Sequence, residues 1–315
     1  MKTAVFGGAV ALAWSLVGTA LAAPVAYVPN EKSGTISMID TATDTVADTI
    51  VTGGKPRGTA VSPDGATLYV SDQTSNALLV VDVAARRVRD RIALGESPEG
   101  VSLSRDGSLV AAASEVANGV VLAETGGERR HWMIKVPGKN PEHAVFSPDG
   151  RWLYVSAEDG AQVDVIDVAR RTVAGSVPVG NRPRGIAFTP DGRTAWVACE
   201  IDGTLYAIDV ATRTSGKPIA TGPFANGVAV APSGARVYVS SGRGARVDVV
   251  DVATSRVTAA IPVGQRPWNM ALTPDGRKLY VANGRSGTVS VIDTSALRRV
   301  ADIPVGELPW GVVVR

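Results

Sequence analysis

Residues Gly185–Gly222 read GIAFTPDGRTAWVACEIDGTLYAIDVATRTSGKPIATG. Ile186–Thr189 alternates apolar and small or polar residues and predicts a short strand. Pro190-Asp191-Gly192 favours a tight turn, because proline presets φ, aspartate bonds to nearby backbone and glycine accepts a positive φ. Further strands are expected over 194–198, 204–208 and 217–221, with a polar turn after Asp209. Four antiparallel strands joined by tight turns form one blade of a propeller.

The turn sequence recurs at a spacing of 42 residues, as from Thr189 to Ala231 and on to Thr273. Its copies are Ser62–Gly65, Ser104–Gly107, Ser147–Gly150, Thr189–Gly192, Ala231–Gly234 and Thr273–Gly276. The aromatic position of the strand beside it holds Tyr27, Tyr69, Ala111, Tyr154, Trp196, Tyr238 and Tyr280. One such unit cannot bury its apolar faces alone, so the period predicts a closed ring. The expected fold is an all-β, seven-bladed β-propeller forming a single domain over residues 23–315.

The two ends of the repeat array predict how the ring closes. The first unit begins at Tyr27 and has no turn sequence and strand before it, whereas the last loop is followed by the apolar stretch Val312–Arg315. We expect this stretch to supply the innermost strand of the N-terminal blade, which would leave no free sheet edge.

Residues 1–22 differ from the repeats. Lys2 precedes an uncharged apolar stretch, and Ala20-Leu21-Ala22 resembles a small-residue cleavage site. This pattern predicts a signal peptide cleaved near Ala22, a periplasmic mature protein and no membrane span after cleavage. The full chain has 32 Lys and Arg residues, so removing residues 1–22 with Lys2 leaves about as many bases as the 30 Asp and Glu residues, which disfavours a nucleic-acid partner. We expect a monomer.

Several residues invite a functional interpretation but fit a structural one better. The lone cysteine, Cys199, cannot form an internal disulfide and is expected in the core. An acid ends the third strand of every unit, where we expect it to cap a turn: Asp40, Asp82, Glu124, Asp167, Asp209, Asp251 and Asp293. The third unit, Gly100–Val136, diverges most, which indicates either drift or a contact site for a partner.

Some of the repeated sequences resemble a known family. Tyr280-Val281-Ala282-Asn283, Val291-Ile292-Asp293 and Pro304-Val305-Gly306 resemble YVTN-type β-propeller repeats. Ile261–Trp268, Thr273–Gly276 and Leu308–Val314 look closer still to the PQQ-dependent catabolism-associated β-propellers. The resemblance implies an association with periplasmic quinoprotein alcohol oxidation. It brings no catalytic residues, and it does not imply that the propeller itself holds the quinone.

Binding is expected on one face of the ring. Strands alternate in direction, so the Val-Gly-x-x-Pro loops and the loops after the tyrosine strands share a face around the central channel. The residues just after the loop proline or its equivalent vary most: Arg57, Glu99, Glu142, Arg184, Asn226, Trp268 and Trp310. The second-strand loops add Glu31, Gln73, Glu115, Glu158 and Glu200. The predicted binding residues are Arg57, Glu99, Glu142, His143, Arg184, Arg266, Trp268 and Trp310.

The same face is expected to be polarised. Blades three and four would present acids, whereas arginines would gather on blades six and seven: Arg243, Arg246, Arg266 and Arg285. Such a rim with tryptophan walls suits a small polar ligand or a protein surface. A solvated loop face with charges of both signs is an equally good interpretation.

Few residues suit metal or cofactor chemistry. His143 stands where the sister loops have glycine and is one of two histidines. Paired with Glu142 or Glu158, it could ligate a metal or relay a proton. One histidine without a second nearby is a weak metal signal, and His131 is expected in an outer strand. We therefore expect no metal, haem or quinone cofactor.

Three functions remain open. The sequence favours a non-catalytic periplasmic propeller that binds a protein or a small polar ligand, in support of quinoprotein-linked alcohol oxidation. The alternative is a hydrolase or lactonase, for which Glu99 and Glu115 could supply acid–base chemistry. A structural cell-surface propeller is the third. Convergence of the acids and His143 at the channel mouth would favour an enzyme.

Overall fold

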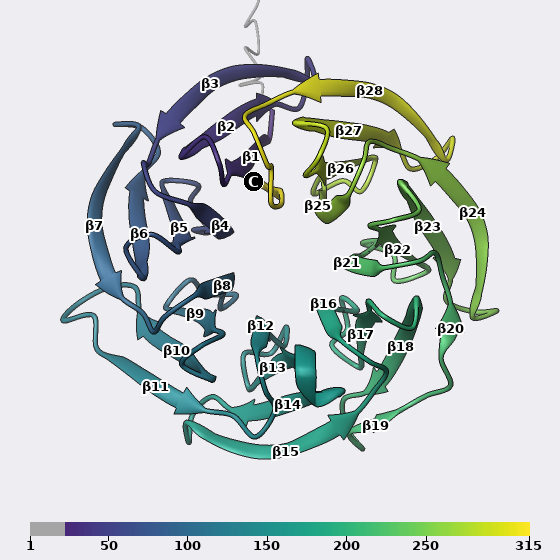
Figure 1. Ribbon diagram of the computed structural model, residues 1–315, viewed down its shortest axis with the longest axis horizontal. Coiled ribbons are helices and arrows are strands. Elements are labelled where there is room, and N and C mark those ends of the chain that lie inside the picture. The colour runs from purple at the N-terminus through teal and green to yellow at the C-terminus, as the bar shows by residue number, and fades with distance from the viewer. Residues whose placement is uncertain (1–22) are drawn as a thin grey trace, which may run out of the picture.

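The computed structural model describes residues 23–315 and shows seven antiparallel sheets arranged in a ring around a central axis (Figure 1). Each sheet is one blade, with its innermost strand beside the channel and its outermost strand on the wall of the ring. The predicted all-β, seven-bladed propeller is therefore confirmed. The predicted signal peptide and its cleavage site near Ala22 lie outside the described residues.

The blades are numbered from the N-terminus. Blade 1 holds β29 (Val313–Val314), β1 (Val25–Asn30), β2 (Thr35–Asp40) and β3 (Thr45–Val51). Blade 2 holds β4 (Pro56–Val61), β5 (Thr67–Asp72), β6 (Ala77–Asp82) and β7 (Arg87–Ala93). Blade 3 holds β8 (Pro98–Leu103), β9 (Leu109–Ser114), β10 (Gly119–Glu124) and β11 (His131–Lys135). Blade 4 holds β12 (Pro141–Phe146), β13 (Trp152–Ala157), the 3-10 turn η1 (Glu158–Gly160), β14 (Gln162–Asp167) and β15 (Thr172–Pro178).

The remaining blades repeat this order. Blade 5 holds β16 (Pro183–Phe188), β17 (Thr194–Cys199), β18 (Thr204–Asp209), β19 (Thr214–Ser215) and β20 (Ile219–Ala220). Blade 6 holds β21 (Ala225–Val230), β22 (Arg236–Ser241), β23 (Arg246–Asp251) and β24 (Arg256–Pro262). Blade 7 holds β25 (Pro267–Leu272), β26 (Lys278–Asn283), β27 (Thr288–Asp293) and β28 (Arg298–Pro304).

The ring closes where the sequence predicts. Strand β29 pairs antiparallel with β1, aligning Val313 with Tyr27, and the C-terminal end of the chain lies beside β1 in Figure 1. The backbone of Arg315 exchanges two hydrogen bonds with Val25, at 2.7 and 3.0 Å. Val312 packs into the apolar cluster between blades 7 and 1, and Val313 packs against the cluster between blades 1 and 2. The closure therefore combines strand pairing with burial on both sides of blade 1.

The repeated residues occupy the places that their chemistry requires. The turn glycines all have positive φ, for example Gly65 at 74° and Gly192 at 70°. The five strand tyrosines, Trp196 and Ala111 are buried, and so is Cys199, whose pKa burial raises to about 12. The third-strand aspartates cap their turns, as when the Thr212 N–H donates to Asp209 Oδ1 at 2.7 Å. Glu124 is the exception, because its carboxylate pairs with Arg130 at 2.7 Å.

One position on this turn face links neighbouring blades. It lies four residues after the third-strand acid, or five after Glu124, and has positive φ in every blade. We call these the staple positions: Asp44, Arg86, Arg129, Arg171, Arg213, Ser255 and Leu297. Five of them contact the preceding blade: Asp44 pairs with Lys278 at 2.7 Å, Arg86 pairs with Asp48 at 2.7 Å, Arg129 pairs with Asp90, and Arg171 and Arg213 lie over Trp132 and Trp152. Leu297 packs against the apolar cluster that blades 6 and 7 share.

One strand differs from the sequence expectation. The fourth strand of blade 5 is interrupted, with β19 and β20 separated by residues 216–218, because Pro218 has no N–H to donate to the ladder. Blade 3 keeps the common topology despite its divergent sequence. Its unusual segment forms the turn before β11, where Arg130 and Arg171 both lie near the Trp132 ring.

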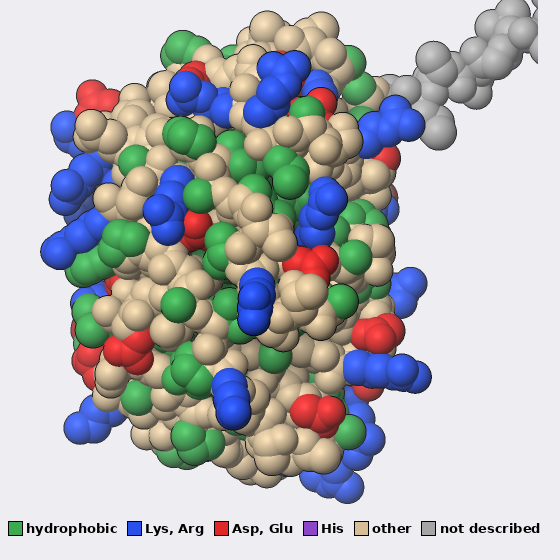
Figure 2. Space-filling view, turned by 90° about the vertical axis from the view of Figure 1, so that its right-hand side faces the viewer, with side chains coloured by type: hydrophobic (Ala, Val, Ile, Leu, Met, Phe, Trp, Pro, Cys, Tyr) green, Lys and Arg blue, Asp and Glu red, His purple; other side chains and the backbone are tan. Residues whose placement is uncertain are grey.

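The outer wall has no large apolar surface on the side that faces the viewer in Figure 2. Figure 2 shows Lys and Arg side chains interspersed with Asp and Glu, and hydrophobic side chains scattered singly. Among the described residues, no helix is long and apolar enough to cross a membrane.

Candidate functional site

Seven equivalent residues meet at one end of the channel. Each follows the loop proline or its equivalent near the start of an innermost strand, and we call these the mouth positions: Arg57, Glu99, Glu142, Arg184, Asn226, Trp268 and Trp310. All seven line a single cavity of about 190 Å³. Its other lining residues are Glu31, Glu115, Glu158, Arg182 and Asn269. The expectation that these loops share one face is therefore confirmed.

Backbone bonds fix a second ring of residues beside the first. These rim positions directly follow each second strand: Glu31, Gln73, Glu115, Glu158, Glu200, Gly242 and Gly284. In each blade the rim N–H donates to the carbonyl of the residue before the loop proline or its equivalent, for example Glu115 to Ser97 at 3.0 Å and Glu200 to Arg182 at 2.9 Å. The repeat therefore places a rim side chain beside a mouth side chain in every blade.

The inner strands approach one another closely below the mouth. A Cβ on Gly58 would lie 2.3 Å from the carbonyl oxygen of Glu99, so only glycine fits there. Buried serines tie the mouth residues across blades, since Ser71 Oγ donates to the Glu99 carbonyl at 2.6 Å and Ser240 Oγ to that of Trp268 at 2.6 Å. These contacts hold the mouth side chains on a rigid base.

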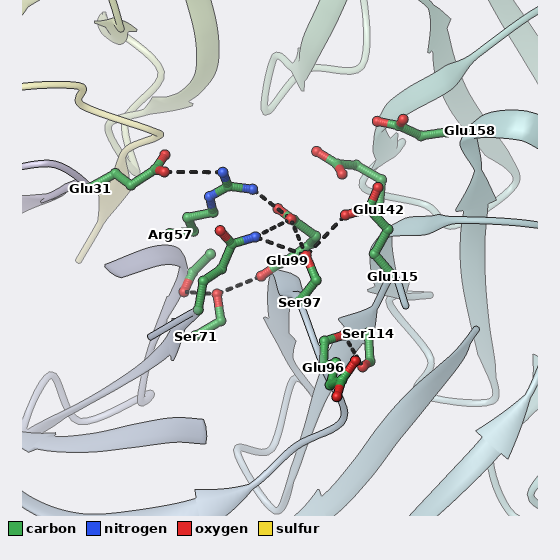
Figure 3. Close-up of polar contacts among 12 residues, drawn as sticks. Glu31, Arg57, Ser71, Glu96, Ser97, Glu99, Ser114, Glu115, Glu142 and Glu158 are labelled. Carbon is green, nitrogen blue, oxygen red and sulfur yellow. Dashed lines mark hydrogen bonds and ion pairs between the residues drawn. The ribbon is translucent and has the colours of Figure 1, made fainter. Parts of the chain in front are cut away.

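Arg57 organises the half of the mouth formed by blades 1 to 3 (Figure 3). Its guanidinium pairs with Glu99 Oε1 at 2.5 Å and with Glu31 Oε1 at 3.1 Å. Gln73 donates to the same Glu99 oxygen at 2.6 Å. Ser97 lies next to Glu99 and donates to Glu115 Oε2 at 3.0 Å, so one hydroxyl connects the two carboxylates.

Arg184 organises the half formed by blades 4 and 5. Its Nη1 lies 3.0 Å from Glu142 Oε1 and also contacts Glu158, while its Nε lies 3.3 Å from Glu200 Oε2. Arg182 joins the same network through Glu158 at 3.0 Å and Glu200 at 3.1 Å. One buried guanidinium thus holds three carboxylates.

Burial and crowding shift the pKa values of these groups. The side chain of Glu99 is 1% exposed, and burial, with the charges of Glu142 and Glu115, raises its pKa to about 8 against the opposing effect of Arg57. Burial would also raise the pKa of Glu142, but Arg184, His143 and Arg57 outweigh it and lower that pKa. Two neighbouring carboxyls therefore differ in protonation near neutral pH, an arrangement typical of functional sites.

His143 and Trp310 cross the channel from opposite blades. Their rings stack with centroids 5.5 Å apart and planes inclined by 21°. Trp310 is 9% exposed, and both ring nitrogens of His143 are shielded from solvent. Burial lowers the pKa of His143, although Glu142 and the Asn269 side chain favour its charged form. This pair narrows the channel beside the cavity, and His143 does not pair with Glu158 as the sequence suggested.

The predicted binding residues divide into three groups. Arg57, Glu99, Glu142, Arg184, Trp268 and Trp310 line the cavity, His143 stacks on one of them, and Arg266 lies at the edge, 3.1 Å from Glu200. Sequence reasoning missed Arg182, Ser97 and Asn269 as parts of the site. Arg182 and Ser97 are equivalent residues before the loop proline, so the repeat spacing was the signal that could have found them. The predicted arginine Arg246 pairs with Asp248 at 2.9 Å instead.

Metal binding finds little support in the geometry. Within residues 23–315, no group of three or more His, Cys, Asp or Glu side chains is arranged to hold a metal ion. Except for Glu115, the glutamates of the mouth contact arginines, which supply the charge that a cation would otherwise supply.

Comparisons with known proteins agree with this architecture. A family described as "Lactonase, 7-bladed beta-propeller" matches residues 169–307, and one described as "YNCE-like beta-propeller" matches residues 3–108. Both are families of β-propellers. No curated protein matches the chain.

Solved structures share the fold at low sequence identity. Hydrazine synthase of Kuenenia stuttgartiensis matches with a TM-score of 0.79 and 23% identity over 90% of this chain and 99% of that one. A functionally unknown protein of Desulfotomaculum acetoxidans matches with a TM-score of 0.80 and 18% identity over 92% and 98%. Dihydro-heme d1 dehydrogenase NirN, solved in complex with DHE, matches with a TM-score of 0.67 and 17% identity over 92% and 74%.

Proposed function

We propose that the channel mouth binds a small polyhydroxylated ligand, such as a sugar or a sugar derivative, and that this binding is the function of the protein. The observation that carries the proposal is the convergence of all seven mouth positions on one cavity of about 190 Å³. These are the positions at which the repeats differ most, whereas the residues that build the blades recur.

The chemistry of the lining suits hydroxyl groups. Carboxylates accept hydrogen bonds and guanidinium groups donate them, so a lining that holds both Glu and Arg side chains can satisfy hydroxyl groups, which donate and accept. Trp268 and Trp310 add apolar surface against which the C–H face of a sugar ring can pack. Buried ion pairs such as Arg184 with Glu142 stabilise a fold weakly, which favours a role in recognition.

Titration calorimetry tests this proposal. Purified protein should bind glucitol, used as a neutral polyol probe, and Glu142→Gln should weaken the binding by about tenfold. Arg86→Gln, at a staple position on the opposite face, is the matched control and should bind as the wild type does. Absence of heat with glucitol and with a panel of other neutral polyols would refute the proposal.

Lactone hydrolysis is the second candidate, and Glu99 favours it. A carboxyl whose pKa is about 8 keeps its proton at neutral pH and can donate it to the ring oxygen of a lactone when water adds to the carbonyl carbon. The carbonyl C–O bond of the ring then breaks, a proton of the added water passes to the Glu99 carboxylate, and the hydroxy acid forms. The lactonase family match over residues 169–307 and the meeting of acids at the mouth support this candidate. A pH-stat assay with glucono-δ-lactone should show turnover that Glu99→Gln abolishes.

The cellular setting of this binding is a further part of the proposal. The apolar N-terminal stretch supports export to the periplasm, and the repeat sequences of blades 6 and 7 support a role beside quinoprotein-linked alcohol oxidation. Fractionation of cells that produce the protein, followed by co-purification from periplasm after growth on an alcohol, tests both. Retention in the cytoplasm would overturn the periplasmic assignment.

A further inference from the structure

The residue at the rim position changes from glutamate in blade 5 to glycine in blades 6 and 7. Glutamate occupies the rim position in blades 1, 3, 4 and 5, whereas blades 6 and 7 carry Gly242 and Gly284 there. The next residue in these two blades is an arginine, Arg243 and Arg285, and both are exposed. Blades 6 and 7 therefore lack the acidic rim side chain of blades 1, 3, 4 and 5, and each carries a basic side chain next to that position.

The glycine of blade 7 makes room for a large side chain of the mouth. A Cβ on Gly284 would lie 2.7 Å from Trp268 Cζ3, so the indole covers the space of a missing side chain. A Cβ on Gly242 would lie 3.6 Å from Cδ and Nη1 of Arg266, which is ordinary van der Waals contact. A glutamate in place of Gly284 would displace the indole of Trp268, and the sector would lose its present shape.

Positive charge in this sector is poorly compensated. Arg243 and Arg266 both lie over the Phe224 ring, at 3.7 and 5.8 Å, and Arg266 has one acidic partner, Glu200. Arg243 and Arg285 form no ion pair with any residue from 23 to 315. Burial and the charges of Arg184, Arg285 and Arg243 lower the pKa of Arg266, against the opposing effect of Glu200.

We propose that Arg243, Arg266 and Arg285 bind an anionic oxygen group of the ligand, a carboxylate or a phosphate. Guanidinium groups present forked donors that match such groups, and an anion would relieve the repulsion among the arginines. This inference rests on the proposed function, since the hydroxylated part of the same ligand occupies the neighbouring cavity beside Trp268. It narrows the ligand class from polyols in general to acidic ones such as sugar acids.

Gluconate and glucitol form a matched pair of probes, because they differ mainly in one carboxylate. Calorimetry at low salt should show that the wild type binds gluconate about tenfold more tightly than glucitol. The double variant Arg243→Gln, Arg285→Gln should bind both equally, with the affinity for glucitol unchanged. Arg256→Gln removes an exposed arginine from β24 on the outer wall and should leave both affinities as in the wild type. Inorganic phosphate should compete with gluconate and leave glucitol binding unaffected.

The outcomes separate this inference from the proposed function. Equal affinities of the wild type for gluconate and glucitol would overturn the anion subsite and leave the polyol site standing. A preference for gluconate that survives the double variant would overturn the role of these arginines. Failure of the wild type to bind either compound would overturn both the inference and the function on which it rests.

Discussion

The two faces of the ring use charged residues in different ways. On the turn face, the ionic staple positions pair a charge with one partner in the preceding blade, as Arg86 does with Asp48. At the mouth, Arg184 alone faces three glutamates, and Glu99 retains its proton near neutral pH. Simple pairs are sufficient to join blades. The network at the mouth is denser than joining blades requires, which supports the proposal that this face binds the ligand.

The largest loss of stability should come from removing β29, the strand that closes the ring. Deletion of Val312–Arg315 unpairs β1 and exposes Val312 and Val313, so we expect a loss of about 5 kcal/mol or more in the free energy of unfolding. Thermal and urea melts measure it, with Arg315→Ala as the control that keeps the backbone pairing. An unchanged midpoint after the deletion would show that closure does not depend on this strand.

Substitution of the two tryptophans of the mouth should distinguish a residue that stabilises the fold from one that contacts the ligand. Trp310 is buried against His143, so Trp310→Ala should cost about 3 kcal/mol of stability. Trp268 is half-buried, and Trp268→Ala should mainly weaken ligand binding, by about 2 kcal/mol. Melts and calorimetry on the same samples test this. Equal loss of stability in both variants would remove the distinction.

A staple variant tests the opposite face. Asp44→Ala leaves Lys278 and the Tyr280 hydroxyl without their partner at the seam between blades 1 and 7. We expect stability to fall by about 1–2 kcal/mol, because partly buried polar groups lose a charged partner, while ligand affinity stays constant. Ser255→Ala provides the comparison at the equivalent position of blade 6. A change in affinity with Asp44→Ala would mean that the faces are coupled.

The last expected effect concerns the pH dependence of stability. The folded protein raises the pKa of Glu99 from 4.5 to about 8, so it holds a proton that the unfolded chain releases. Stability from this group is therefore lost as the pH rises from about 4.5 through about 8. Glu99→Gln, which cannot ionise, should flatten this decline, while the exposed Glu307→Gln should not. Parallel melting profiles for wild type and Glu99→Gln would contradict the assignment.

Local chemistry explains why the fold was predictable. The turn sequences, the strand tyrosines and the terminal apolar stretch each fit one structural role. The regular spacing of the repeats predicts the number of blades. The site was predictable only as a set of positions. Neither the stack of His143 on Trp310 nor the sharing of Arg184 by three glutamates follows from spacing, because these residues come from different blades and meet only after the ring closes.

The seam between β1 and β29 has a kinetic consequence. It pairs Tyr27 with Val313, so a contact that completes the ring joins residues from opposite ends of the described chain. Closing such a long loop is entropically costly, and folding dominated by distant pairings is slow. Until β29 docks, the backbone groups of β1 remain open to other strands, including those of a second molecule. The folding intermediate most prone to aggregation should therefore contain six complete blades and one open edge, and peptides that mimic residues 312–315 should suppress its self-association.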